Sequence, residues 1–186
     1  MRVFKVVLAT WLLAMSGLVA VAQRPATEWQ TRLQQVLPLL GHRNWIMIVD
    51  SAYPLQSSSG VETIETNTDQ MEVIRQVLGA IDSSIQVRPI VYMDAELPFV
   101  AEKDAPGVNA YRQAIKTALG GRKITSLPHE QIIAKVDEVG KTFHILVLKT
   151  TMTVPYTSVF LQLNCKYWSD DAEAAMRKAM SGGGAK

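Results

Sequence analysis

Three short segments of this chain carry side chains that could move protons on a neutral polyhydroxyl compound. They contain His42 with Asp50 eight residues later, His129, and Tyr156. Histidine gives or takes a proton near neutral pH, and a carboxylate can orient it or bind a hydroxyl group. A neutral tyrosine hydroxyl both donates and accepts hydrogen bonds. Together these groups suit general acid–base chemistry on such a compound, although each segment alone is a weak indication.

Each of these residues also has an ordinary structural explanation. His42 follows Gly41 at an expected helix end, where histidines commonly lie at the surface, and Asp50 could form a turn after a strand. His129 could face solvent near a helix start, and Tyr156 could be a core aromatic with its hydroxyl at the surface. The residue types alone leave both explanations open.

The sequence does not predict a metal site or another cofactor. It holds three histidines, without the His-x-x-x-His spacing of many metal sites. His144 lies in an apolar segment, where we expect a structural role. The single cysteine, Cys165, excludes an intramolecular disulfide, and its apolar neighbours favour a buried thiol.

The first 22 residues have the pattern of a secretory signal peptide. Arg2 and Lys5 precede an apolar stretch from Val6 to Val19, and Ala20-Val21-Ala22 places small residues where a signal peptidase cuts. The stretch is shorter than the ~20 residues of a membrane span. We therefore expect an exported protein, periplasmic or secreted, with no membrane segment after cleavage. An uncleaved membrane anchor is the alternative.

Cleavage after residue 22 of 186 would leave a mature chain within the ~100–200 residues of one typical domain. We expect that domain at 23–168, followed at 169–186 by a short helix and a flexible Gly182–Gly184 tail. Loss of Arg2 and Lys5 lowers the 19 basic residues to match the 17 acidic ones. No basic run alternates with aromatic residues, so a nucleic-acid partner is not expected.

Apolar runs of strand length alternate with helical patterns along the mature chain. Five consecutive apolar residues at 45–49 indicate a strand buried on both faces. Other strands are expected at 87–93, 143–150 and 158–165, and a serine-rich loop at 51–64. Helices are expected at 30–40, after a cap at Asp69, at 109–119, from about 128, and at 170–180. The pattern predicts an α/β layered domain with a mostly parallel or mixed sheet flanked by helices.

The expected strand at 45–49 separates the two strongest candidates. Ligands of such sheets bind where loops leave the carboxyl ends of the strands, which is where Asp50 lies. His42 precedes the same strand, and five residues span ~17 Å. The two side chains therefore need not meet within one subunit, and one of them can belong to a neighbour's site.

Four segments resemble the ribose pyranase and fucose mutarotase family, RbsD/FucU, within roughly residues 33–166. They are Leu40-Gly41-His42, Ile48 to Pro54, Pro128 to Gln131, and Pro155 to Val159. The resemblance implies the family's fold, a monosaccharide ligand, and sugar ring or anomer interconversion without a cofactor. It implies His42 as proton donor with Asp50 as its catalytic partner, and sugar contacts from Asp50, His129, Tyr156 and Ser158. It also implies a ring-shaped homo-oligomer with sites shared between subunits.

The chain departs from the family's pattern ahead of Pro155. Lys149-Thr150-Thr151-Met152 stands where the family usually carries Arg-x-Gly-Glu, so Lys149 is the remaining cationic candidate for a sugar contact. Lysine lacks the bidentate geometry of arginine, and Met152 carries no charge. On the resemblance, we expect a monosaccharide mutarotase or pyranase-like isomerase. The departures leave a non-catalytic carbohydrate-binding protein or an oligomeric scaffold as alternatives.

Overall fold

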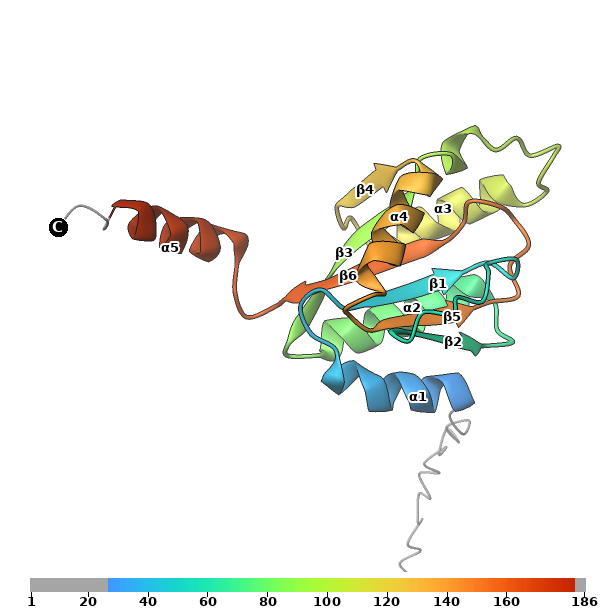
Figure 1. The fold of residues 1–186 in the computed structure, drawn as a ribbon. Coiled ribbons are helices and arrows are strands. Elements are labelled where there is room, and N and C mark those ends of the chain that lie inside the picture. Colours follow the sequence, from blue (N-terminus) through green and yellow to red (C-terminus); the bar gives the residue numbers. More distant parts are fainter. Residues whose placement is uncertain (1–26, 183–186) are drawn as a thin grey trace, which may run out of the picture.

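A six-stranded sheet forms the centre of the computed structural model, which describes residues 27–182 (Figure 1). Its strands lie in the order β2-β5-β1-β6-β3-β4. The strands are β1 (Trp45–Val49), β2 (Val61–Glu65), β3 (Val87–Asp94), β4 (Ile124–Leu127), β5 (Ile145–Lys149) and β6 (Val159–Cys165). The helices are α1 (Glu28–Val36), η1 (Leu37–Leu39), α2 (Gln70–Ser83), η2 (Leu97–Phe99), α3 (Val108–Leu119), α4 (His129–Val139) and α5 (Asp170–Gly182). The predicted α/β class with a mixed sheet is confirmed.

One strand runs against the direction of the rest. β6 lies between β1 and β3 and is antiparallel to both. β1 and β2 are each parallel to β5, and β4 is parallel to β3. The carboxyl ends of five strands therefore meet at one edge of the sheet, together with the amino end of β6. Loops from distant parts of the sequence converge at that edge.

The sheet separates two apolar layers. Ile46 and Ile48 of β1 pack into the larger layer with α1, α2 and α3, while Trp45, Met47 and Val49 pack into the smaller one with α4. All five β1 residues are buried, as the continuous apolar run predicts. α5 extends away from both layers (Figure 1) and buries none of its residues from 170 to 181.

The two edge strands were not predicted from the sequence. β2 occupies the end of the segment expected as a loop at 51–64, so that prediction is wrong for its last residues. β2 is only half-buried and carries Glu62 and Glu65, and β4 alternates between half-buried and exposed residues. Such strands lack the continuous apolar run that marks a central strand.

Several predicted helix boundaries hold. The Asp69 side chain accepts the Glu72 N–H at 3.2 Å and begins α2, and Gly120 ends α3 with a left-handed φ of 57°. The helix predicted at 30–40 instead begins at Glu28 and gives way to η1 after Val36, because Pro38 has no N–H for an α-helical bond.

The predictions for the two ends of the chain and for Cys165 have different outcomes. The predicted signal peptide lies outside the described residues. Across residues 27–182, no helix is both long enough and apolar enough to cross a membrane. α5 includes Gly182, which the sequence placed in a flexible tail, whereas Gly183 and Gly184 are not described. Cys165 is half-buried rather than buried, because it ends β6 beside polar residues.

Candidate functional site

Most of the predicted site residues lie at the edge where the strand ends converge. Asp50 follows β1, His129 follows β4 after Pro128, and Lys149 ends β5. Ser158 immediately precedes β6, which runs in the opposite direction. Topology alone therefore brings together residues that are more than 100 positions apart in the sequence.

A cavity of about 330 Å³ opens at this edge. Asp50, His129 and Tyr156 line it, together with Tyr53, Glu130 and the apolar side chains of Pro54, Ile133 and Pro155. A volume of this size and a mixture of apolar surface with a few polar groups are typical of small-molecule sites. The structure thus joins three of the predicted residues in one cavity.

Hydrogen bonds hold the Asp50 carboxylate in place. Oδ1 accepts the Ala52 N–H at 2.9 Å, and Ser158 Oγ lies 3.4 Å from Oδ2. Ser158 is buried, and its hydroxyl donates to the Asp50 carboxylate. A carboxylate has about four acceptor positions, which leaves Asp50 able to accept from ligand hydroxyl groups.

The His129 side chain contacts a buried carboxylate, Asp94, that was not among the predicted site residues. His129 Nδ1 lies 3.1 Å from Asp94 Oδ1. The Asp94 side chain has no exposed surface, and its Oδ2 has no hydrogen-bond partner within residues 27–182. An acceptor at Nδ1 fixes the tautomer of a neutral imidazole with the proton on that nitrogen. Nε2 is then the nitrogen free to accept a proton or a hydroxyl hydrogen.

Glu96 fixes the helix that carries His129. Its two carboxylate oxygens accept the His129 N–H at 3.0 and 3.1 Å. Pro128, which precedes α4, provides no side-chain cap. The first amides of a helix lack internal acceptors and favour a nearby negative charge. Glu96 therefore supplies the cap from another loop.

Two tyrosines also line the cavity. The Tyr156 ring meets the His129 ring edge to face, with centroids 5.7 Å apart. Tyr156 has a φ of 59°, which is unusual for a bulky residue and commonly found at functional sites. Burial raises the pKa of Tyr53 above its ordinary value, with a smaller contribution from nearby carboxylates. Tyr53 is therefore a neutral phenol.

Replacing Asp94 with asparagine is expected to raise the melting temperature at neutral pH. Burial raises the pKa of the Asp94 carboxyl, and His129 only partly offsets this effect. The folded state then holds its proton more tightly than the unfolded state, so stability falls as pH rises from the ordinary pKa through the raised one. Asparagine removes this cost at nearly constant size. One kcal/mol corresponds to about 2–4 °C in a domain of this length.

Thermal unfolding of both proteins at pH 3, 5 and 7 measures the effect of Asp94→Asn. The stabilisation should be greatest at pH 7 and vanish at pH 3, where the carboxyl is protonated in both states. A gain of equal size at all three pH values would show that the Asp94 charge is not its cause.

His42 precedes β1, so it lies at the opposite ends of the strands from Asp50. Its loop is held to β6 by the Arg43 N–H, which donates to the Leu163 carbonyl at 3.0 Å. His42 Nδ1 lies 2.8 Å from Asn164 Oδ1. Because the whole of β1 separates His42 from Asp50, the two side chains do not meet within one subunit. This is the arrangement that the strand length predicts.

Two further candidates, Lys149 and His144, do not line the cavity. Lys149 reaches the same edge, in register with Val49 of β1, but it does not line the cavity. Its role in sugar binding stays a prediction. His144 Nε2 lies 3.5 Å from Glu62 Oε2, away from His42 and His129. Within residues 27–182, no group of three or more possible ligands is placed to hold a metal ion.

Sequence reasoning could have found Asp94. It follows the apolar residues of β3 in the same way that Asp50 follows those of β1. The chain order gave no sign that β6 would bring the ends of β1 and β3 to one edge. Tyr53 lies within the Ile48 to Pro54 segment, which resembles the family, but no role was predicted for it. Glu96 carried no comparable pattern.

Known proteins resemble this chain both in sequence and in fold. The model of the RbsD / FucU transport protein family matches residues 29–165. Similar solved structures include Bacillus subtilis RbsD complexed with D-ribose, at 18% identity and a TM-score of 0.51, covering 72% of this chain and 92% of that chain. FucU from Bifidobacterium longum has 18% identity, coverage of 72% and 94%, and a TM-score of 0.49. The fucose mutarotase from Streptococcus pneumoniae in complex with L-fucose has 20% identity, coverage of 72% and 91%, and a TM-score of 0.47.

No curated protein matches the chain. The family match nevertheless covers most of the sequence and includes His42, Asp50, His129 and Tyr156. The B. subtilis RbsD structure shares the fold. This chain therefore belongs to the RbsD / FucU transport protein family.

Proposed function

We propose that this protein interconverts the ring or anomeric forms of a free monosaccharide by general acid–base catalysis. The observation that carries the proposal is the cavity where Asp50, His129 and Tyr156 converge, with Asp94 behind the imidazole. Membership of the family supports it. The D-ribose complex of B. subtilis RbsD supports a monosaccharide as the ligand class.

The reaction needs proton transfers but no redox chemistry. In a cyclic hemiacetal, the bond between C1 and the ring oxygen breaks as that oxygen gains a proton and the anomeric hydroxyl loses one. Rotation about C1–C2 and the reverse transfers close the ring in another form. Sugars do this slowly in water, and positioned acid or base groups each contribute about 10²–10⁴-fold. Histidine and carboxylate side chains are sufficient for the task.

The residues take separate roles in this proposal. His42 exchanges the proton with the sugar, and Asp50 orients the acid–base group or holds a hydroxyl. His129 presents Nε2 to a sugar hydroxyl because Asp94 faces Nδ1. Tyr156 contributes its phenol to orientation, and Ser158 supports Asp50.

The separation of His42 from Asp50 leads us to propose a ring-shaped homo-oligomer in which each site combines residues of two subunits. A mixture of His42→Ala and Asp50→Asn proteins, after subunit exchange, is expected to regain activity that neither variant has alone. Some mixed sites then combine an intact His42 with an intact Asp50. Recovery is measured by the same sugar exchange assay, with each variant mixed with itself as the control. No recovery, despite demonstrated subunit exchange, would contradict shared sites.

Saturation-transfer NMR tests the proposed function directly. D-ribose, L-fucose, D-glucose and D-galactose are each incubated with the protein at neutral pH, and exchange between ring forms is compared with buffer and with heat-denatured protein. Faster exchange for at least one sugar is expected and would identify the substrate. Unchanged exchange for all four sugars would reject catalysis on them.

Met152 supports the alternative of a non-catalytic sugar-binding protein. Its side chain is partly buried against the larger apolar layer, so this position offers no charge to a ligand. Such a protein would show a sugar-dependent rise in melting temperature without faster exchange, because ligand binding stabilises the folded state.

Export is a further part of the proposal. Removal of residues 1–22 would leave a mature protein beginning at Gln23, with the sugar-binding domain at 23–168 and a C-terminal segment at 169–186. The enzyme would then meet sugars before their uptake. The intact mass of protein recovered outside the cytoplasm tests this proposal, and the full-length mass there would contradict cleavage.

A further inference from the structure

A second cavity, of about 480 Å³, surrounds His42. Its floor includes His42 and Asn164, and its wall comes from the segment after β6, including Tyr167, Trp168, Glu173 and Arg177. The family match ends at residue 165, so this wall lies outside the part of the chain that the family defines. The region next to the proposed proton donor is therefore shaped in part by residues that lie outside the family match.

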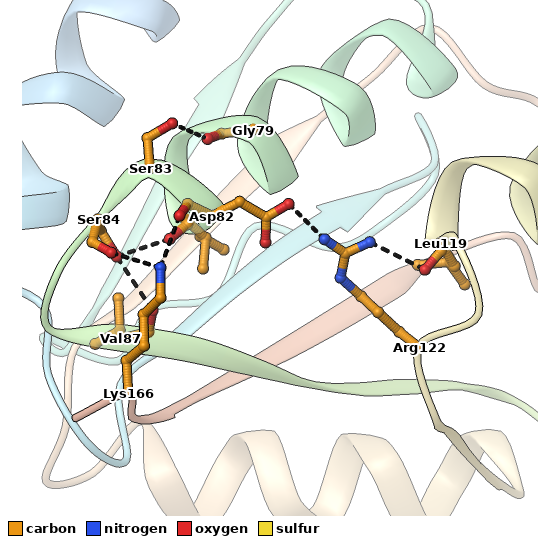
Figure 2. A network of polar contacts seen from close by, with 9 residues as sticks. Gly79, Asp82, Ser83, Ser84, Val87, Leu119, Arg122 and Lys166 are labelled. Atoms are coloured by element: carbon orange, nitrogen blue, oxygen red, sulfur yellow. Dashed lines mark hydrogen bonds and ion pairs between the residues drawn. The ribbon is translucent and has the colours of Figure 1, made fainter. Parts of the chain in front are cut away.

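Hydrogen bonds anchor the start of this wall to the domain. Figure 2 shows Lys166 Nζ donating to the carbonyl oxygens of Asp82 and Ser84, at 2.7 Å each, at the end of α2. Arg88 donates through Nε to the Cys165 carbonyl at 3.1 Å and through Nη2 to Asp170 at 2.7 Å. The chain thus leaves β6 in a defined direction, and the wall begins beside His42.

The polar side chains of the wall are already ordered around Glu173. Trp168 Nε1 donates to Glu173 Oε2 at 2.9 Å, and Arg177 Nη2 lies 2.6 Å from Oε1. The Trp168 hydrogen bond, followed by Arg177 and His42, lowers the pKa of the Glu173 carboxyl. Glu173 is therefore an ionised acceptor whose remaining lone pairs can receive hydroxyl hydrogens.

The charges and aromatic surface favour a neutral ligand. Arg177 offsets Glu173, and Arg88 offsets Asp170, so these two ion pairs leave the wall without a strong net charge. Tyr167 is 80% exposed and Trp168 43% exposed, although both are large aromatic residues. An exposed aromatic face beside polar groups can pack against the C–H face of a sugar ring while its hydroxyls are hydrogen-bonded.

We propose that residues 167–177 form a sugar-binding wall beside His42, with Trp168 as the aromatic platform and Glu173 as the hydroxyl acceptor. The ligand class is a neutral monosaccharide rather than a sugar phosphate, because Glu173 already pairs with the arginine of the wall. The inference rests on the proposed function in taking His42 as the group that exchanges a proton with the same sugar.

Iodide quenching of tryptophan fluorescence tests the wall without requiring turnover. Trp29 and Trp45 are each 2% exposed, so Trp168 is the accessible tryptophan within residues 27–182. Comparison with a Trp168→Phe variant shows how much of the fluorescence comes from Trp168. At least one of D-ribose, L-fucose, D-glucose and D-galactose is expected to protect Trp168 from iodide, whereas D-ribose 5-phosphate is not. Equal or better protection by the phosphate would overturn the ligand class.

Two variants test the assigned contacts. Glu173→Gln is expected to weaken sugar protection of Trp168 by about three- to tenfold, and Trp168→Ala to raise KM by a similar factor with a smaller change in kcat. Asp171→Asn is the matched control, because Asp171 is an exposed carboxylate of the same helix that does not line the cavity. Circular dichroism checks that each variant retains its fold.

The outcomes separate this inference from the proposed function. Sugar exchange by the wild type, with no protection of Trp168 and an unchanged KM in both variants, would overturn the wall and leave the proposed function standing. Protection of Trp168 without sugar exchange would support the wall and reject the catalytic proposal. Absence of both protection and exchange would reject both.

Discussion

Replacing His42 with alanine is expected to slow sugar ring exchange by about 10²–10⁴-fold, the usual contribution of a positioned acid or base. The side chain is exposed, and its Nδ1 contact with Asn164 is near the surface. Its removal should therefore change stability by no more than about 0.5 kcal/mol. Saturation-transfer NMR measures the exchange, and thermal unfolding shows that the variant remains folded.

His144→Ala is the matched control for this experiment. Like His42, His144 does not line the Asp50 cavity. It also does not line the cavity around His42. Its loss should leave ring exchange near the wild-type rate. If His42→Ala retained wild-type exchange while folded, His42 would not be the proton donor. Equal losses in both variants would point to a general structural effect.

Gly60→Ala is expected to destabilise the protein by about 1–3 kcal/mol or more, as overpacking of a tight backbone contact does. A Cβ at this position would lie 2.4 Å from the Gly140 carbonyl oxygen and 2.9 Å from that of Phe143. Both are backbone atoms and cannot move aside as a side chain would. The Gly60 carbonyl also accepts the Ile145 N–H at 2.8 Å, so a shift would disturb the pairing of β2 with β5.

Gly79→Ala separates this steric effect from the loss of a glycine as such. Gly79 lies inside α2, and a Cβ there would meet no atom within 4 Å. Alanine is favoured over glycine in a helix by about 1 kcal/mol, so Gly79→Ala should raise the melting temperature. Thermal unfolding of both variants provides the measurement. Equal melting temperatures for Gly60→Ala and the wild type would show that the backbone at 140–143 relaxes without cost.

Strong local patterns made the central elements predictable. The five apolar residues of β1 and the Asp69 cap of α2 were both read correctly, because burial and capping act on neighbouring residues. β2 and β4 were missed since an edge strand needs only one covered face and tolerates charged residues such as Glu62. Their pairing partners, rather than their own composition, make them strands.

The candidate site was predicted through chemically distinctive residues and motif similarity. Asp50, His129 and Tyr156 meet in one cavity. The Asp94 contact with His129 depends on β6 inserting between β1 and β3, and no local pattern encodes that order. The left-handed backbone of Tyr156 is likewise set by the turn entering β6. Long-range strand order therefore decides which polar residues become neighbours.

The stability of α5 controls whether the cavity around His42 is formed. With 13 residues and no buried side chain from 170 to 181, it has little beyond its own backbone bonds and a few ion pairs to hold it. Isolated helices of about 12–15 residues are marginal in water. The wall can therefore unwind while the sheet stays folded. The apparent affinity of this cavity for a sugar is proportional to the fraction of molecules in which the wall is formed. The helix–coil equilibrium of α5 therefore sets this affinity, whereas the free energy of unfolding of the domain does not.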